Sequence, residues 1–327
     1  MEGRKENEEK VLKRIKETLV VAPKYIKEYY YTLNDKSYTT KYVYLNYVLD
    51  FLNFLDFELG LNIRDVRCFR QVKTSTINRY IAQLDGKESI KASRLYGIKN
   101  FFNYLISDEY LENNPCDRAS IPRDKEEHKI ISLTKEEIET VKNNVLTYCG
   151  KINARPSQKQ WIKRDYAIVM VGLSLGLRVT SLAEINLEDI DFQNKEIKVV
   201  EKGNKIRLVK FGTQIEEILL DWINERKYIL VDSGKKNSAL FISNQIKRIN
   251  VRSIEKMITK YTYNIDKHIT PHKLRSTCAT TLYNATGDIY LTADRLGHSN
   301  ISNTRRYAQI SEERKQKAVD AVDSILF

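Results

Sequence analysis

Apolar side chains in the first third of the chain recur at the spacing of amphipathic helices. Residues 39–59 carry such side chains three and four positions apart, and this face holds Tyr44, Tyr47, Val48, Phe51, Leu52 and Leu55. A hydroxyl at Thr39 or Thr40 is suited to cap the start of this helix. The same periodicity predicts two further helices, one beginning near Thr74–Ser75 and one over residues 90–111.

The helix over residues 90–111 is expected to bury Leu95, Ile98, Phe101, Phe102, Leu105 and Ile106. We interpret the aromatic stripe as the core of an all-α domain, in preference to a surface on which bases stack. Asn114-Pro115 ends this domain, because the residue before a proline disfavours helix. The domain therefore covers residues 21–115. It is preceded by a charged helix or frayed arm over 1–20 and followed by a linker over 116–131.

The pattern changes in the second domain, predicted over residues 132–310. Thr134 with Glu137 three positions later is a capping box, and an apolar helix follows that ends near Gly176. Two short alternating segments, 197–201 and 206–211, flank Gly203-Asn204 and predict a β-hairpin. Helices are then expected over 214–229, 251–261, 272–285, 288–296 and 301–308, with an amphipathic tail over 311–327. The predicted fold class is mainly α, with one small β-hairpin or sheet in the second domain.

Composition narrows the class of partner. The formal net charge is +12 over 327 residues, which favours a polyanion such as nucleic acid, although a lysine-rich coding bias would explain part of the excess. No apolar run is long enough to cross a membrane, and the charged N-terminus does not resemble a signal peptide. The cysteines are scattered without a C-x-x-C pair, which argues against a zinc site or disulfides. We therefore expect a cytoplasmic, nucleoid-associated protein without a membrane partner.

Candidate chemistry is concentrated in residues 270–311. His272 and Arg275 lie three apart, the turn Leu296-Gly297-His298 follows, and Tyr307 comes nine residues after His298. His268 and His272 have the spacing of a helical metal pair, but Pro271 between them disfavours a regular helix there. Upstream, Gly176-Leu177-Arg178 offers a second cation, and Lys202-Gly203-Asn204-Lys205 places lysines on the hairpin turn.

Six polar residues occur along the chain in the order Arg178, Lys202, His272, Arg275, His298 and Tyr307. This order resembles the signature of the tyrosine recombinase (phage integrase-like, Xer-like) family. The resemblance implies a two-domain, C-shaped DNA clamp in which an all-α core-binding domain precedes the catalytic domain. It also implies a site-specific recombinase that cleaves and rejoins DNA through a 3′-phosphotyrosine link, during integration, excision or resolution. No nucleotide cofactor is expected, because each step exchanges one phosphodiester for another. No metal is expected either, because two arginines are available for the phosphate and the sequence shows no cluster of carboxylates to hold one.

By this resemblance each candidate catalytic residue has a role. Tyr307 is the nucleophile, preferred to Tyr283 and Tyr290 because it follows the Leu-Gly-His turn. Arg178, Arg275 and His298 hold the phosphate, and a guanidinium suits this role because it is planar and permanently charged. His272 accepts the tyrosine proton. Lys202 protonates the leaving 5′-oxygen, with Lys205 as the less favoured alternative on the same turn.

Two positions depart from the pattern of many relatives. Ser181 stands where an acidic residue commonly follows the first arginine, and Glu184 is a candidate substitute one turn further on. Ser276 stands where a histidine commonly follows the second arginine. Both are supporting positions, so we expect an active enzyme.

Binding residues and partners are less specifically indicated. The predicted partner is double-stranded DNA with a specific recombination site, bound by a homotetramer in the synaptic complex. The resemblance implies that the tail helix over 311–327 is donated to a neighbouring protomer, and the alternative is a helix packed on its own domain. Accessory DNA-bending or directionality proteins are possible additional partners. Candidate DNA contacts are Lys36, Thr39, Lys41, Arg79, Lys91, Ser93, Arg94, Lys205, Arg207 and Lys273.

Three other functions are compatible with parts of the sequence. A type IB-like topoisomerase would share the catalytic set but relax single duplexes. A non-catalytic DNA-binding regulator would bind sites without requiring Tyr307. A nuclease would leave free ends with no protein attached to them.

Overall fold

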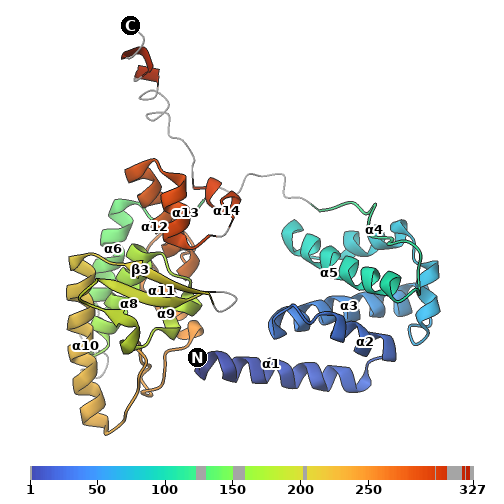
Figure 1. Cartoon of the computed structure of the whole chain (residues 1–327), viewed down its shortest axis with the longest axis horizontal. Helices are drawn as coiled ribbons and strands as arrows, with labels where there is room; N and C mark the ends of the chain where they lie inside the picture. Colours follow the sequence, from blue (N-terminus) through green and yellow to red (C-terminus); the bar gives the residue numbers. More distant parts are fainter. Residues whose placement is uncertain are drawn as a thin grey trace. The chain divides into compact units, whose positions relative to one another are not determined.

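The computed structural model describes residues 2–122, 130–149, 159–201, 205–298, 300–307, 319–320 and 322–324, with backbone alone for 2–7 (Figure 1). The chain forms two compact units, Met1–His128 and Lys129–Phe327. The fold is mainly α with one small antiparallel sheet, as the sequence predicts. No helix among the described residues is long and apolar enough to cross a membrane.

The N-terminal unit contains only helices in its described part. Its elements are α1 (Glu2–Val21), α2 (Lys24–Thr32), α3 (Tyr38–Leu59), the 3-10 helix η1 (Val66–Gln71), α4 (Thr74–Gln83) and α5 (Glu88–Ser107). Of the two structures expected for the first twenty residues, the helix is correct. Ile15 of α1 is buried in the same core as α3 and α5, so α1 belongs to this unit.

Aromatic side chains form the centre of this unit. Phe51, Phe101 and Phe102 are completely buried, and the ring of Phe51 lies edge-on to that of Tyr80 with centroids 5.1 Å apart. Such edge-to-face pairs are a favourable geometry for aromatic rings. The prediction that the aromatic stripe forms the core is confirmed. Ile106, expected in the same core, is only partly buried.

Single polar side chains fix the start of α3 and the end of the N-terminal unit. The cap of α3 is Ser37, whose hydroxyl accepts from the Thr40 backbone amide at 3.3 Å, so the prediction of Thr39 or Thr40 is wrong. The helix begins earlier than its apolar pattern does, because Ser37 keeps the extended backbone that a cap requires. Asn114 is buried and its side chain donates to the carbonyl of Lys99 at 3.0 Å, which ties the end of the unit to α5.

The predicted linker, 116–131, is packed at both of its ends. Cys116 and Ala119 are buried in the N-terminal core. Near the other end, the backbone amide of Leu133 donates to the hydroxyl of Thr277 at 2.9 Å, within the C-terminal unit. Residues 123–129 lie outside the described part of the chain.

In its described part, the C-terminal unit combines a small sheet with several helices. Its helices are α6 (Lys135–Leu146), α8 (Ile162–Leu175), α9 (Val179–Glu184), η2 (Leu187–Asp189), α10 (Thr213–Ser233), α11 (Val251–Tyr261), α12 (Pro271–Thr286), α13 (Ile289–Leu296) and α14 (Ser302–Arg305). The strands are β1 (Ile190–Asp191), β2 (Glu196–Val200) and β3 (Ile206–Lys210), in the order β1-β2-β3. The capping box at the start of α6 is confirmed, with the Thr134 amide donating to the Glu137 carboxylate at 2.7 Å.

The hairpin predicted from residues 197–211 is confirmed. Strands β2 and β3 are antiparallel with Ile197 opposite Val209, and both of these side chains are buried. The additional strand β1 pairs with β2 and was not predicted, because two residues are too few to show an alternating pattern. The tip of the hairpin, residues 202–204, lies outside the described residues.

Helix α8 is central in this unit, because it packs against α6, α10 and α12 (Figure 1). It ends at Gly176, which has a left-handed backbone with φ of 59°. A Cβ atom at Gly176 would lie 2.9 Å from Leu296 Cδ2 and 3.0 Å from Cys278 Sγ, so only glycine fits here without a shift of its neighbours. Gly176 thus lies close to α12 and α13, and Arg178 follows two residues later, directly before α9.

Little of the C-terminal tail is described. The helix predicted over 301–308 is observed as α14, Ser302–Arg305. In the tail predicted over 311–327, only residues 319–320 and 322–324 are described, and they are helical with Val319 and Val322 about half exposed.

Candidate active site

Arg178 is the residue immediately before α9, and its side chain is 38% exposed. Its Nη1 atom is paired with the carboxylate of Glu201, the residue directly after β2. Partial burial and the positive charge of Arg207 lower the pKa of Arg178. The guanidinium is thus fixed on one side by an acid and still accessible to solvent.

Arg275 lies in α12 and is only 2% exposed. Its two Nη atoms donate to the carbonyls of Gly176 and Leu296, each at 2.6 Å. These bonds join three separate segments, namely the turn after α8, the end of α13 and α12 itself. Burial, followed by the charge of Arg178, lowers the pKa of Arg275 to about 10, so it remains a cation at neutral pH. Both hydrogen-bond partners are uncharged, and the cation therefore still attracts an anion.

The turn after α13 presents His298. Gly297 ends the helix with φ of 64°, and His298 follows with its Nδ1 atom 2.8 Å from the hydroxyl of Thr304. Thr304 is completely buried in α14, so its hydroxyl fixes the imidazole ring at Nδ1. Sequence reasoning did not identify Thr304, because a threonine in a short helix carries no distinguishing signal.

Tyr307 follows α14 and is 4% exposed. Its ring packs with Ala279 and Leu296 and lies nearly parallel to that of His298, with centroids 6.4 Å apart. The exposed Arg306 places its guanidinium 5.7 Å from the same ring. Arg275 and Tyr307 are also close enough to influence each other electrostatically. The tyrosine is therefore held among several positive charges. We call Arg178, Arg207, Arg275 and Arg306 the cationic cluster.

The two histidines of the cluster are in the neutral form at pH 7. Partial burial, then the charges of Arg275 and Arg178, lower the pKa of His298 to about 4. His272 is exposed in the first turn of α12, and desolvation followed by the charge of Arg306 lowers its pKa as well. A neutral imidazole has one nitrogen that can accept a proton.

The structure brings together five of the six candidate catalytic residues: Arg178, His272, Arg275, His298 and Tyr307. The sixth, Lys202, lies outside the described residues. Its alternative, Lys205, is described and exposed, and its carbonyl accepts from the Glu201 amide at 2.8 Å. This bond closes the base of the turn that carries Lys202.

A carboxylate that the sequence did not indicate lies beside Arg178. Glu201 is 8% exposed and pairs with both Arg178 and Arg207. Ser181 is buried and donates to the carbonyl of Val200, the residue before Glu201. Ser276 is buried and donates to the carbonyl of His272 at 3.1 Å. The one available signal for Glu201 was its position directly before Lys202.

The candidate DNA contacts in the N-terminal unit have mixed surroundings. Lys41 is 8% exposed with its Nζ atom 5.0 Å from the centre of the Tyr30 ring, so this buried cation is poorly placed for a phosphate. Thr39 and Ser93 are exposed. Four cations pair with acids of the same unit: Lys36 with Asp35, Arg79 with Glu58, Lys91 with Glu88 and Arg94 with Asp50. Ion pairs near the surface are weak enough to be exchanged for phosphate contacts.

In the C-terminal unit, Lys273 is partly exposed beside His272. Arg207 is largely buried, and its guanidinium donates to the carbonyl of Arg295 at 3.0 Å and to Glu201 at 2.9 Å. These contacts occupy the atoms with which Arg207 would grip DNA, and they favour an internal role for it.

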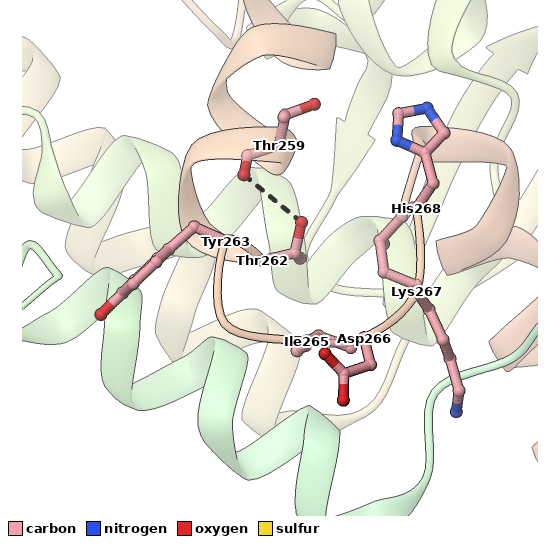
Figure 2. Close-up of a pocket in the computed structure, with 8 residues that line it drawn as sticks. Thr259, Thr262, Tyr263, Ile265, Asp266, Lys267 and His268 are labelled. Atoms are coloured by element: carbon pink, nitrogen blue, oxygen red, sulfur yellow. Dashed lines mark hydrogen bonds between the residues drawn. The ribbon is translucent and has the colours of Figure 1, made fainter.

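A pocket of about 360 Å³ lies at the loop before α12 (Figure 2). It is lined by Thr259, Thr262, Tyr263, Ile265, Asp266, Lys267, His268 and Ile269. None of these is a candidate catalytic residue. Among the described residues, no group of three or more histidines, cysteines or acids is gathered as a metal site.

The fold, the clustered cations and the buried tyrosine agree with the comparisons to known proteins, and together they define the class as a tyrosine-type site-specific recombinase. The model of the phage integrase family matches residues 131–314, which is more than half of the sequence. The chain therefore belongs to the phage integrase family.

Individual relatives are distant in sequence. The tyrosine recombinase XerC of Mannheimia succiniciproducens is 27% identical over 301 residues, covering 90% of this chain and 96% of the relative. The XerC of Caldanaerobacter subterraneus subsp. tengcongensis is 28% identical over 272 residues, covering 80% and 72%.

Two solved structures show the same fold. A Tn1549 transposon integrase in complex with circular intermediate DNA has a TM-score of 0.67 and 19% identity, covering 91% of this chain and 99% of that one. XerH bound to its difH substrate before cleavage has a TM-score of 0.65 and 18% identity, covering 90% and 83%.

The first prediction concerns the glycine of the Leu-Gly-His turn. Gly297 and Gly234 have nearly identical φ values, 64° and 65°, but only Gly297 has a close neighbour, since an added Cβ would lie 2.7 Å from Arg207 Nε. Gly234→Ala should therefore cost only the left-handed backbone strain, about 1 kcal/mol. Gly297→Ala should cost more, because Arg207 is held by other bonds and cannot move away freely.

Urea unfolding measures this difference. Both tryptophans of the chain, Trp161 and Trp222, lie in the C-terminal unit, so their fluorescence reports the unfolding of that unit. Equal free-energy losses in the two alanine variants would contradict the packing of Arg207 against Gly297.

The second prediction concerns pH. Above about pH 6.5, the ordinary histidine pKa, His298 is neutral in both the folded and unfolded chain. As the pH falls further, the unfolded chain gains a proton that folded His298 takes up only near its pKa of about 4. The stability of the C-terminal unit should therefore fall between pH 6.5 and 4.

His298→Asn removes this titration and keeps a polar atom near Thr304. Its free energy of unfolding should decline less steeply than that of the wild type over the same interval. His268→Asn, at an exposed histidine, provides the matched control. Parallel curves for the wild type and His298→Asn would disprove the prediction.

Proposed function

We propose that this recombinase cleaves and rejoins DNA strands through a covalent link to Tyr307. The observation that carries the proposal is the position of the Tyr307 ring. It is buried beside His298 and within the electrostatic reach of Arg275, whose guanidinium is fixed by two backbone carbonyls. A hydroxyl nucleophile among fixed cations is suited to attack on a phosphodiester.

The reaction conserves phosphodiester bonds. The phenol oxygen of Tyr307 attacks phosphorus, a 3′-phosphotyrosine bond forms, and the bond from phosphorus to the 5′-oxygen breaks. In the second step a 5′-hydroxyl attacks the same phosphorus and releases the tyrosine. Covalent catalysis of this kind divides one difficult step into two easier ones, and it needs no nucleotide as an energy source.

Negative charge develops on the non-bridging oxygens of the phosphate in the transition state. Arg178 and Arg275 are assigned to these oxygens, because donors fixed in advance stabilise developing charge most effectively. His298 is assigned a further hydrogen bond from Nε2. For that bond the Thr304 hydroxyl must donate to Nδ1, 2.8 Å away, so that the ring proton resides on Nε2.

Proton transfer requires a base and an acid. His272 is assigned to accept the proton of Tyr307, and its lowered pKa keeps it unprotonated before the reaction. Lys202 is assigned to protonate the leaving 5′-oxygen, on the basis of its place in the Lys-Gly-Asn-Lys turn. Lys205 on the same turn is the alternative donor.

The proposed substrate is double-stranded DNA with a specific site. Related structures are recombinases bound to recombination-site DNA, and the net charge of +12 on this chain suits a polyanion. Exchange of all strands between two duplexes requires four cleavages. We therefore propose that four protomers assemble on two DNA sites.

A covalent-trapping experiment tests the proposal. Purified protein is incubated with fragments of its own genomic neighbourhood that carry nicks, in EDTA and without ATP, so that cleaved strands diffuse away. We expect a protein–DNA adduct on a denaturing gel, with the protein attached to the 3′ end of the cleaved strand. Free ends without attached protein would indicate a nuclease. Relaxation of a supercoiled plasmid without site preference would indicate a topoisomerase.

A further inference from the structure

Glu201 lies between two arginines of the cationic cluster, and none of the proposed catalytic roles explains its position. Its carboxylate is buried, with Oε2 paired to Nη1 of Arg178 and Oε1 accepting from Nη2 of Arg207 at 2.9 Å. One acid thus bridges two guanidiniums that come from different elements, the start of α9 and strand β3.

Arg207 extends this bridge to the Leu-Gly-His turn. Its Nη1 atom donates to the carbonyl of Arg295 at 3.0 Å, near the end of α13. Its Nε atom is buried without a hydrogen-bond partner, at the place where a Cβ atom on Gly297 would lie 2.7 Å away. The connection therefore continues from Arg178 through Glu201 and Arg207 to the backbone that carries His298.

The backbone around Glu201 is itself fixed. Ser181 donates to the carbonyl of Val200 at 2.9 Å, which ties the end of β2 to α9. The amide of Glu201 donates to the carbonyl of Lys205 at 2.8 Å, which closes the base of the hairpin. With its backbone held on both sides, the Glu201 carboxylate has a defined place relative to Arg178.

Charge explains why an acid is needed at this point. Arg178 and Arg207 are near enough for the charge of Arg207 to lower the pKa of Arg178. Without a carboxylate between them, the two guanidiniums would repel each other. Arg178, the more exposed of the two, would turn toward solvent.

We propose that Glu201 is a positioning residue, which aligns Arg178 for the scissile phosphate and couples it through Arg207 to the turn of His298. This inference depends on the proposed function, because it assumes that Arg178 binds the phosphate. It also has a distinctive consequence. The carboxylate repels DNA but aligns a catalytic group, so its removal should slow cleavage without weakening DNA binding.

The experiment compares Glu201→Gln with the wild type on the same nicked fragments, at protein concentrations that saturate the DNA. We expect the rate of adduct formation to fall by roughly 10- to 100-fold. This is the range of effects seen when a residue that orients a metal ligand, without binding the metal itself, is mutated. The affinity for a labelled 40-base-pair duplex should stay equal or increase a few-fold, because the protein loses a negative charge. Glu217→Gln, at an exposed residue of α10, is the matched charge control and should leave the cleavage rate unchanged.

A conservative variant separates alignment from stability. Glu201→Asp keeps the charge but is too short to bridge both arginines, so its cleavage rate should lie between those of Glu201→Gln and the wild type. Tryptophan fluorescence in urea reports whether the C-terminal unit of each variant remains folded.

The outcomes distinguish this inference from the proposed function. If the wild type forms no adduct, the proposed function fails. If the wild type forms adducts and Glu201→Gln forms them at the same rate, the positioning role is wrong. A parallel loss of cleavage, DNA affinity and stability in both Glu201 variants would also overturn it, since a purely structural role predicts that result. Slower cleavage with retained binding supports the inference.

Discussion

Replacement of Tyr307 by phenylalanine is expected to eliminate the protein–DNA adduct and leave DNA binding nearly unchanged. The substitution removes only the hydroxyl, and the ring can remain packed against His298 and Leu296. Loss of a covalent nucleophile lowers an enzymatic rate by roughly 10⁶-fold. The remaining rate would be far below what a gel assay detects, so the variant should show no adduct at all.

Two other tyrosines provide the controls for this experiment. Tyr290 is exposed on α13 and Tyr283 is buried in α12, and both precede Tyr307 by a short distance in the sequence. Tyr290→Phe and Tyr283→Phe should form adducts as the wild type does. An adduct that persists in Tyr307→Phe and disappears in one of these variants would reassign the nucleophile. Binding in each case is measured by a mobility shift with a labelled duplex.

Replacement of Arg178 by alanine is expected to lower the rate of strand cleavage by roughly 10³-fold or more, the scale of arginines that stabilise phosphoryl transfer. Arg178 is partly exposed, so its removal leaves no cavity in the core. DNA binding should lose one phosphate contact among many, and the slope of log affinity against log salt should decrease by about one. The effect should therefore fall on catalysis much more than on binding.

Single-turnover cleavage at saturating protein isolates the chemical step in this variant. Arg252→Ala removes the same charge from an exposed position on α11 and serves as the matched control. Its cleavage rate should equal that of the wild type. If Arg178→Ala lost binding and cleavage in equal proportion, Arg178 would be a general DNA contact without a special role at the phosphate.

The cationic cluster is suited to bind an anion, because its positive charge is only partly balanced within the free protein. Arg275 donates to two neutral carbonyls, and burial, followed by the nearby positive charges, lowers the pKa of His272 and of His298. A phosphate entering this cluster would relieve the repulsion among its cations. Glu201 balances two of these cations in the free protein and orients them in advance.

Much of the fold was predictable because it depends on neighbours in sequence. Helix α11 spans Val251–Tyr261 as its apolar periodicity predicts, and the capping box of Thr134 and Glu137 marks the start of α6. The Gly203-Asn204 turn between alternating segments predicted the β2–β3 hairpin. These signals act within one or two turns of chain, and the residues that produce them can be read directly.

The sequence by itself determined which residues could carry the chemistry and their order along the chain. Only the tertiary structure decided which partners fix them: carbonyls at Gly176 and Leu296 for Arg275, and Glu201 for Arg178. It also decided that Lys41, a plausible DNA contact by composition, is buried against an aromatic ring. The physical reason is that such contacts join segments far apart in sequence. Their geometry depends on how helices and strands pack, which local periodicity does not encode.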